Sequence, residues 1–188
     1  MKLKKFEHIK FTDGGVCAAK GFKANGIQCG LAHKPLAATE DNSQQSVNVE
    51  PEKKKNDLAV IFADKICTAA AVYTTNKVKG APIQVTKEHI SNGMARAIVV
   101  NSVNANTCNA DGEEKAEAMC KLTADALGIA PEEVMVMSTG VIGQILPLEP
   151  IEKAIPVLCE KLSPNGNLEA ATAITVSYTH LRAHETLM

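Results

Sequence analysis

Two hydroxyl residues and a glycine, Ser138, Thr139 and Gly140, follow the apolar run VMVM at residues 134–137. A phosphate-binding loop would carry several glycines and a lysine before the hydroxyl, and this segment has no lysine. A nucleophilic hydroxyl needs an adjacent base, but the nearest histidine before these residues in the sequence is the distant His89, and no G-x-S-x-G motif is present. An oxyanion hole needs only a hydroxyl and a rigidly held backbone N–H, which Thr139 and Gly140 offer. The segment therefore indicates either an oxyanion hole or a tight turn without chemistry.

A second cluster of small polar residues follows another apolar run, AIVV at residues 97–100. It contains Asn101, Asn104 and Asn106, whose amides could bind a substrate. Asparagine also favours turns, because its side chain bonds nearby backbone groups, and the residues alone leave both interpretations open. Loops that converge at one edge of a sheet are a common way to build a site, so the two polar clusters are candidates for a shared one.

Apolar runs predict the strands that position these clusters. The segment DLAVIFAD at residues 57–64 is a continuous apolar run bounded by acids, as in a buried strand, and residues 68–76 are expected to pair with it as a hairpin. The segment APIQVTKEHISNG, which starts at Ala81, predicts a further strand and a short helical turn. Turns that join short strands are expected in the glycine-rich residues 14–31, and buried strands at 97–100 and 134–138.

Two helices are predicted between and after these strands. Asp111 and Glu114 form a capping-box pattern that starts the first helix, and Gly128 is expected to end it. A second helix begins near Pro150. Because the start of the chain is rich in strands and only the later part alternates, the pattern favours the α+β class over a regular βαβ fold. The inward faces are predicted to be Ala116, Met119, Cys120, Thr123 and Leu127 in the first helix, and Ile151, Ile155, Leu158 and Leu162 in the second.

Composition narrows the class of protein. The 188 residues are 45% hydrophobic and 22% charged, as in an ordinary globular domain, and the formal net charge is −1. We expect no nucleic-acid partner, because no basic run is interleaved with aromatic residues. No run of 18 apolar residues and no secretory leader pattern is present, so we expect a cytoplasmic protein without a membrane partner. The six cysteines form no C-x-x-C pair and are expected to be small reduced thiols, with Cys108 in a polar loop as the one candidate for reactivity.

Two segments depart from the rest of the chain. Residues 35–56 are almost entirely polar and are expected to form a surface loop or insertion. The last residues, 175–188, contain VSYTHLRAHET, which resembles the translation of the transposon end used to tag sequencing libraries, so we interpret them as non-native. Two other interpretations remain for the pair His180 and His184, which are a metal site and an ordinary helix.

Several motifs in one order resemble the N-terminal part of the ornithine acetyltransferase family, the bifunctional glutamate N-acetyltransferases of arginine biosynthesis. The motifs are TTN-x-V-x-x-AP from Thr74, NS-x-NAN from Asn101 and STGVIG from Ser138. Longer matching stretches include KGFKANGIQCGL, DLAVIFAD and ALGIAPEEVMVM. The resemblance covers most of residues 14–174, and it identifies residues 1–174 as the N-terminal part of an acetyltransferase domain.

The resemblance implies a fold and a mechanism. The family fold is an α+β sandwich of helices around β-sheets, of which this chain would supply the N-terminal part. Family precursors cut themselves at an Ala-Thr bond, and the freed N-terminal threonine takes the acetyl group from N-acetylornithine and passes it to glutamate. The transfer needs no metal or other cofactor, and bifunctional members also accept acetyl-CoA. The intact protein is expected to be an oligomer in which this alpha-chain portion pairs with the C-terminal beta chain of the same precursor. The oxyanion hole of the family lies at the Thr-Gly of its STG motif, which matches Thr139 and Gly140.

The sequence departs from the family pattern in three places. One departure is the polar stretch 35–56. Another is Val103, where the family has a glycine that would ease a turn. The cleavage site and the nucleophile are also absent, because the bonds Ala38-Thr39 and Ala171-Thr172 lack the family context and are interpreted as ordinary surface or helix residues. We therefore expect an N-terminal fragment that is inactive by itself. The alternative is a non-catalytic module that binds a small metabolite or has a structural role.

Overall fold

The computed structural model describes residues 12–31 and 55–175 of the chain. Most of the polar stretch 35–56, the bond Ala38-Thr39 and the tail 176–188 with its histidine pair lie outside the described residues. The described strands are β1 (Phe22–Ile27), β2 (Leu58–Thr68), β3 (Met94–Asn104) and β4 (Val134–Val141). The helices are α1 (Ala81–His89), α2 (Gly112–Leu127), α3 (Glu149–Glu160) and α4 (Asn167–Ile174), with short 3₁₀ turns at Gly15–Cys17, Ile90–Asn92 and Pro131–Glu133.

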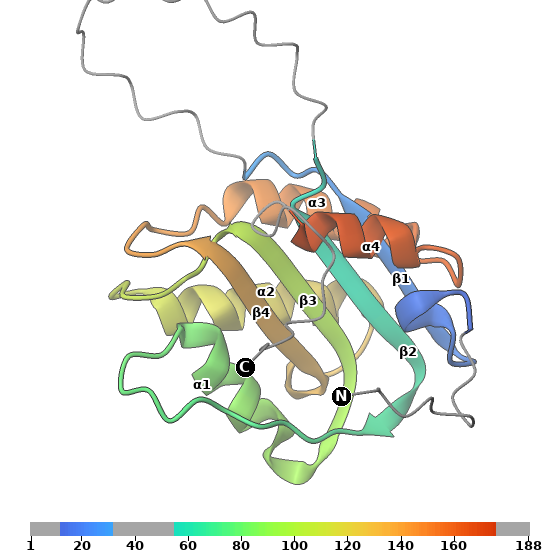
Figure 1. Ribbon diagram of the computed structural model, residues 1–188, viewed down its shortest axis with the longest axis horizontal. Helices are drawn as coiled ribbons and strands as arrows, with labels where there is room; N and C mark the ends of the chain where they lie inside the picture. Colours follow the sequence, from blue (N-terminus) through green and yellow to red (C-terminus); the bar gives the residue numbers. More distant parts are fainter. Residues whose placement is uncertain (1–11, 32–54, 176–188) are drawn as a thin grey trace, which may run out of the picture.

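The four described strands form one mixed sheet in the order β1-β2-β3-β4 (Figure 1). β2 is antiparallel to both of its neighbours, β1 and β3. β3 and β4 are parallel and are connected through α2. Val99 faces Val136 across the parallel pair, and both side chains are buried. The chain therefore combines an antiparallel meander with one parallel crossover, which is an α+β arrangement.

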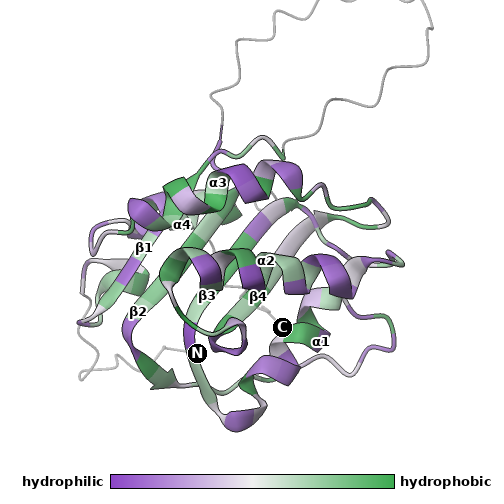
Figure 2. Cartoon of the chain, turned by 180° about the vertical axis from the view of Figure 1, so that it is seen from behind, coloured by the Kyte–Doolittle hydropathy of each residue, from purple (hydrophilic) through white to green (hydrophobic). Residues whose placement is uncertain are grey.

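Helices cover the two faces of the sheet unequally. The main core lies between one face of the sheet and the helices α2 and α3, which Figure 2 shows in front of the strands. On the opposite face, α4 packs across β1 and β2, where Ala170 and Ala173 contact Ala24 and Ala59. Part of that second face, below α4 in Figure 1, has no helix over it among the described residues. No helix in these parts of the chain is long and apolar enough to cross a membrane.

The predicted helices are present, and their apolar spacing explains how they pack. In α2 the buried residues recur at helical spacing, so one face of the helix enters the core. Gly128 ends α2 in the left-handed conformation, as predicted. The Asp111 side chain makes no capping bond, so that part of the prediction was wrong although the helix begins at the expected place. The buried residues of α2 are Gly112, Ala116, Met119, Cys120, Thr123 and Ala124; those of α3 are Ile151, Ile155 and Leu158.

Two strand predictions were wrong. β2 does not form a hairpin with residues 68–76, because its partners are β1 and β3 and the segment after Thr68 lies outside the sheet. The expected strand after Ala81 is the helix α1, which has a proline in its first turn. Proline is well tolerated there, because the first N–H groups of a helix have no partner within it. Strands 97–100 and 134–138 are confirmed and are longer than predicted.

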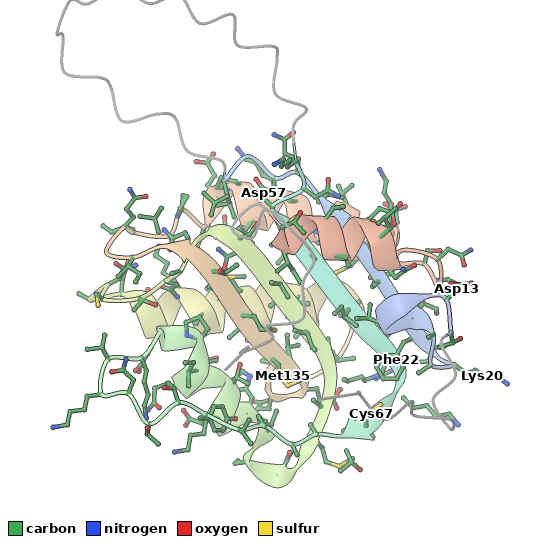
Figure 3. The ribbon with its side chains drawn as sticks, in the orientation of Figure 1. Asp13, Lys20, Phe22, Asp57, Cys67 and Met135 are labelled. Atoms are coloured by element: carbon green, nitrogen blue, oxygen red, sulfur yellow. The ribbon has the colours of Figure 1, made fainter. Side chains whose placement is uncertain are left out.

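The fully buried carboxylate of Asp57 holds the turn after β1 against the start of β2. Its two oxygens accept backbone N–H bonds from Cys29 at 2.6 Å, Gly30 at 3.1 Å and Leu31 at 2.8 Å. The backbone of Asp57 also donates to Ile27 and accepts from Ser102 in β3. Asp57 therefore holds residues 29–31 against the start of β2. Figure 3 labels Asp57 at the upper end of that strand.

We expect Asp57→Asn to lower the free energy of unfolding by about 2–3 kcal/mol, because an amide keeps the volume but offers its NH₂ group to donors that need an acceptor. Urea unfolding followed by circular dichroism measures this loss. Asp64→Asn is the matched control, since Asp64 pairs with Lys23 at the surface and its loss should cost under about 1 kcal/mol. Equal losses for the two variants would contradict the role given to Asp57.

Candidate functional site

The two polar clusters lie side by side at the ends of β3 and β4. Because these strands are parallel, their carboxyl ends reach the same edge of the sheet. Asn101 faces Ser138, Ser102 faces Thr139, and Val103 faces Gly140. The structure thus brings together the residues that the sequence predicted as a shared site.

The neighbouring hydroxyls of Ser138 and Thr139 have different environments. The Ser138 Oγ donates to Oδ1 of the fully buried Asn101 at 2.5 Å, so this hydroxyl braces β4 against β3. No described residue bonds the Thr139 hydroxyl, and Thr139 is half-buried. Of the two hydroxyls, Thr139 is therefore the one available to a ligand.

Gly140 lies where only a glycine fits. Its φ is +135°, and a Cβ atom at this position would lie 2.1 Å from the carbonyl carbon and 2.2 Å from the carbonyl oxygen of Val103. Val103 itself has a φ of +93°, although it is β-branched and buried. The glycine that Val103 replaces in the family pattern would adopt this conformation at little cost, so the structure explains why that position favours glycine.

The backbone N–H of Gly140 is placed on the outer edge of β4. Both the N–H and the C=O of Val136 bond the Thr86 hydroxyl of α1, so these two backbone groups point away from β3. The C=O of Val141 accepts from Ala105 and so faces the other way. Backbone groups alternate along a strand, and Gly140 is in phase with Val136. The Thr139 hydroxyl and the Gly140 N–H are thus two adjacent donors on a rigid strand end.

The asparagine amides serve the backbone around these donors. Asn101 Nδ2 donates to the Asn104 carbonyl at 2.8 Å, and Asn104 Nδ2 donates to the Gln144 carbonyl at 3.0 Å. Asn104 Oδ1 accepts from the Asn106 N–H, and Asn106 Nδ2 donates to the Gly112 carbonyl at the start of α2. The turn interpretation is therefore the one that the structure supports. These bonds hold the loops on both sides of Gly140.

The described residues offer no histidine base to either hydroxyl. His89 is the one histidine among them, and it is buried with Nδ1 2.7 Å from the Val134 carbonyl and Nε2 3.2 Å from a Glu117 carboxylate oxygen. Nor do residues 12–31 and 55–175 contain a cluster of three His, Cys, Asp or Glu side chains able to hold a metal ion. A nucleophilic role for Ser138 or Thr139 is thus not supported.

Three of the cysteines are poorly suited to act as nucleophiles. All six cysteines are free, and Cys108 alone is exposed. Burial raises the pKa of Cys159 to about 11, and it also raises the pKa values of Cys29 and Cys120. These three thiols stay protonated near neutral pH. All six cysteines are small free thiols, but Cys120 alone is fully buried.

An apolar hollow of about 400 Å³ lies beside Ser138, and sequence analysis missed it. We call it the β4 hollow, and its wall includes Tyr73, Pro82, Ile83, Met135, Met137 and Ser138. Residues 71–80, which precede α1, form one wall of the hollow. The sequence predicts a strand at residues 68–76, and a strand in the sheet would place the apolar side chains of this segment in the core. In the structure Val72 and Val78 of this segment are exposed, so it covers no core, and the sequence carries no local signal of this.

Comparison with known proteins supports a family assignment. The model of the ArgJ family matches residues 43–186 of this chain. The chain belongs to the ArgJ family. A relative from Caldanaerobacter subterraneus, the arginine biosynthesis bifunctional protein ArgJ, is 38% identical over 176 residues, which are 93% of this chain and 39% of the relative. The chain thus spans about two fifths of the length of this relative.

Solved structures show the same fold. The crystal structure of the arginine biosynthesis bifunctional protein ArgJ from Bacillus halodurans matches with a TM-score of 0.73 and 35% identity, over 88% of this chain and 78% of that chain. Ornithine acetyltransferase from Mycobacterium tuberculosis, in a complex with ornithine, matches with a TM-score of 0.72 and 29% identity, over 87% of this chain and 80% of that chain. The resemblance stated from the motifs and the α+β class are both confirmed.

Strain at Val103 can be measured by removing its side chain. We expect both Val103→Gly and Val99→Gly to lower the free energy of unfolding. The loss should be about 1–3 kcal/mol smaller for Val103→Gly, because only this substitution also relieves a positive φ. Both valines are buried in β3, so the lost apolar contacts are similar. Chemical denaturation of the two variants gives the difference, and equal costs would show that residue 103 is unstrained.

The close approach at Gly140 makes a second prediction. We expect Gly140→Ala to lower the free energy of unfolding by about 1–3 kcal/mol more than Gly143→Ala does, because the new Cβ would overlap the Val103 carbonyl. Gly143 is the matched control, since it also has a positive φ but a methyl group added there would have no atom within 4 Å. Thermal and urea unfolding check the difference, and a Gly140→Ala variant as stable as Gly143→Ala would contradict the contact.

Proposed function

We propose that this chain supplies the oxyanion hole of an acyltransferase in arginine biosynthesis, which moves an acetyl group from N-acetylornithine to glutamate. The observation that carries the proposal is the pair of adjacent donors, which are the Thr139 hydroxyl, bonded by no described residue, and the outward Gly140 N–H. Relatives named as bifunctional ArgJ proteins and an ornithine acetyltransferase solved with ornithine support the substrate class. The proposal includes a cytoplasmic location.

The donors would act on charge that appears only during the reaction. A nucleophile that attacks the acetyl carbon pushes an electron pair onto the acetyl oxygen, and the Thr139 hydroxyl and the Gly140 N–H would stabilise that negative charge. When the carbon–nitrogen bond breaks, the ornithine amine leaves with a proton and the acetyl group stays on the nucleophile. The amine of glutamate then attacks the same carbon, and the oxyanion hole serves a second time.

The nucleophile is proposed to be an N-terminal threonine on a separate C-terminal chain, produced by self-cleavage of a precursor. The solved B. halodurans chain is covered to 78% and the C. subterraneus relative to 39%, so the solved chain is about half as long as the relative. This ratio supports a two-chain protein. An N-terminal amine can act as the base for its own hydroxyl, so no histidine is needed. The present chain alone would then be inactive.

Other parts of the proposal concern partners. The transfer between amino acids needs no cofactor, because the acetyl group passes from donor to enzyme to acceptor. Acetyl-CoA could serve as a second acetyl donor in a bifunctional protein, and the relatives' names support that class. The intact protein is proposed to be an oligomer of such two-chain units.

We expect Thr139→Ala to lower kcat of the assembled enzyme about 100- to 1000-fold, the cost of removing one oxyanion donor. The assay follows acetyl transfer from N-acetylornithine to glutamate, with this chain co-expressed with a C-terminal chain of the family. KM should change little, because the hydroxyl acts on charge that is absent from the bound substrate.

Two variants control this experiment. Thr139→Ser keeps the hydroxyl and should keep most of the activity. Ser138→Ala removes the neighbouring hydroxyl, which bonds Asn101, and should affect stability more than kcat. Full activity in Thr139→Ala, or equal loss in Ser138→Ala and Thr139→Ala, would overturn the assignment of the oxyanion hole.

A further inference from the structure

A second hollow lies across the loop after β3 from the β4 hollow. Its volume is about 480 Å³, and its wall comes from the segment before α1, the loop before α2 and the first turn of α2, which Figure 1 shows at the same end of the molecule. Residues of the loop alternate between the two hollows, because Ala105 and Thr107 line the β4 hollow whereas Asn106 and Cys108 line the second one. We call it the lysine hollow, and the wall residues used below are Lys77, Lys79, Asn106, Cys108 and Glu113.

Asn106 is the buried polar residue of this wall and is only 1% exposed. Its Nδ2 donates to the Gly112 carbonyl at 2.7 Å, but its Oδ1 is buried and no described residue bonds it. Buried side-chain acceptors normally have a partner, so an acceptor that lacks one needs a water or a ligand to donate to it. Asn106 Oδ1 therefore marks a place for a donor that the described residues do not supply.

The charged side chains of the wall also lack partners. Lys77, Lys79 and Glu113 are exposed, and none of them forms an ion pair within the part of the chain that the structure describes. The two lysines can donate to an anionic group, while Glu113 and Asn106 Oδ1 can accept from a donor. The wall thus presents two cationic donors and two acceptors, with one more positive than negative charge.

The two kinds of group together select the class of ligand. A phosphate or a simple carboxylate would satisfy the lysines but would place further acceptors opposite Asn106 and Glu113. An amine alone would satisfy the acceptors and leave the lysines facing another cation. A free α-amino acid carries an ammonium group and a carboxylate on the same carbon, so it offers N–H donors to the acceptors and two oxygens to the lysines. The excess positive charge of the wall favours an amino acid with a net negative charge, such as glutamate.

We propose that the lysine hollow binds a free α-amino acid, with the carboxylate at Lys77 and Lys79 and the ammonium group at Asn106 Oδ1 and Glu113. The inference goes beyond the proposed function, because the wall of this hollow contains neither of the two oxyanion donors.

The site would nevertheless be coupled to the end of β4 through the loop after β3. The N–H of Ala105 donates to the Val141 carbonyl, and the carbonyl of Thr107 accepts from the Gly143 N–H. Asn106 lies between these two anchored residues. An amino acid bound at Asn106 would therefore stabilise the loop that holds the end of β4.

Calorimetry of this chain with L-glutamate measures the binding. We expect a Kd of about 1 mM or lower. N-acetyl-L-glutamate and glutarate are the matched ligand controls, because both keep the two carboxylates and lack the ammonium group. Each should bind at least about tenfold more weakly, since the charge-assisted bonds to the two acceptors are lost.

Substitutions in the wall test the assignment of the groups. The double variant Lys77→Gln, Lys79→Gln should weaken binding roughly 25-fold, about fivefold for each exposed ion pair. Glu113→Gln should weaken it about fivefold for the same reason. The matched control is the double variant Lys87→Gln, Lys121→Gln, which changes the net charge equally at exposed positions outside the hollow and should bind normally. Circular dichroism checks that each variant is folded.

Two spectroscopic and chemical measurements locate the bound ligand. In the isotope-labelled chain, the side-chain carbonyl carbon resonance of Asn106 should shift when L-glutamate is added. That of Asn101 should not, because its Oδ1 already accepts from Ser138. Cys108 alone among the cysteines is exposed and it lies in the wall, so bound L-glutamate should slow its alkylation by iodoacetamide several-fold. N-acetyl-L-glutamate at the same concentration should leave the alkylation rate unchanged.

The outcomes decide between a ligand site and a hydrated hollow. No binding up to about 10 mM L-glutamate would mean that Asn106 Oδ1 holds only a water, and would overturn the inference. Unchanged binding in the Lys77→Gln, Lys79→Gln variant would contradict it as well. Binding that is lost in Thr139→Ala would place the amino acid at the oxyanion donors instead. Failure of acetyl transfer in the assembled enzyme would count against the proposed function and leave this inference standing.

Discussion

The close backbone contact between Val103 and Gly140 is the constraint on which the site depends. Parallel pairing of β3 and β4 brings the two residues opposite each other, and a Cβ on Gly140 would lie 2.1 Å from the Val103 carbonyl carbon. The strands can stay in register only with a glycine on β4 and a left-handed residue on β3. The other features of the site surround this contact, namely the outward Gly140 N–H, the Thr139 hydroxyl and the asparagine bonds that hold both loops in place.

The donors are rigid because their neighbours are fully used. The Ser138 hydroxyl, the asparagine amides and the Thr86 hydroxyl each bond to another part of the chain. Such bonds hold Thr139 and Gly140 without touching what they would bind, which is how a preorganised site keeps its donors aimed before charge develops. The adjacent hydroxyls differ in environment, because successive side chains of a strand occupy opposite faces and only Ser138 reaches Asn101.

Much of this arrangement could be predicted from the sequence. Apolar runs located β3 and β4, and helical spacing located α2 and α3. The STG segment was the signal for the proposed donors, Thr139 and Gly140. The hairpin after Thr68 could not be excluded, because a run of small apolar residues looks the same whether it pairs in a sheet or crosses the surface. The helix α1 was missed although Pro82 in its first turn was a usable signal. Partners such as Thr86 with Val136, 50 residues apart, carry no local pattern and required the structure.

The parallel crossover also affects the order in which the protein folds. Ser138 and Asn101, which are separated by 37 positions in the sequence, meet only after the chain between them has closed a loop that contains α2. Loop closure must be completed before such contacts contribute to stability. The helix can form early from local contacts, whereas the paired ends of β3 and β4 depend on the whole sheet. Native-state hydrogen exchange at this strand end would therefore report on cooperative folding of the domain, and a site built this way is absent from any partly folded state that lacks the crossover.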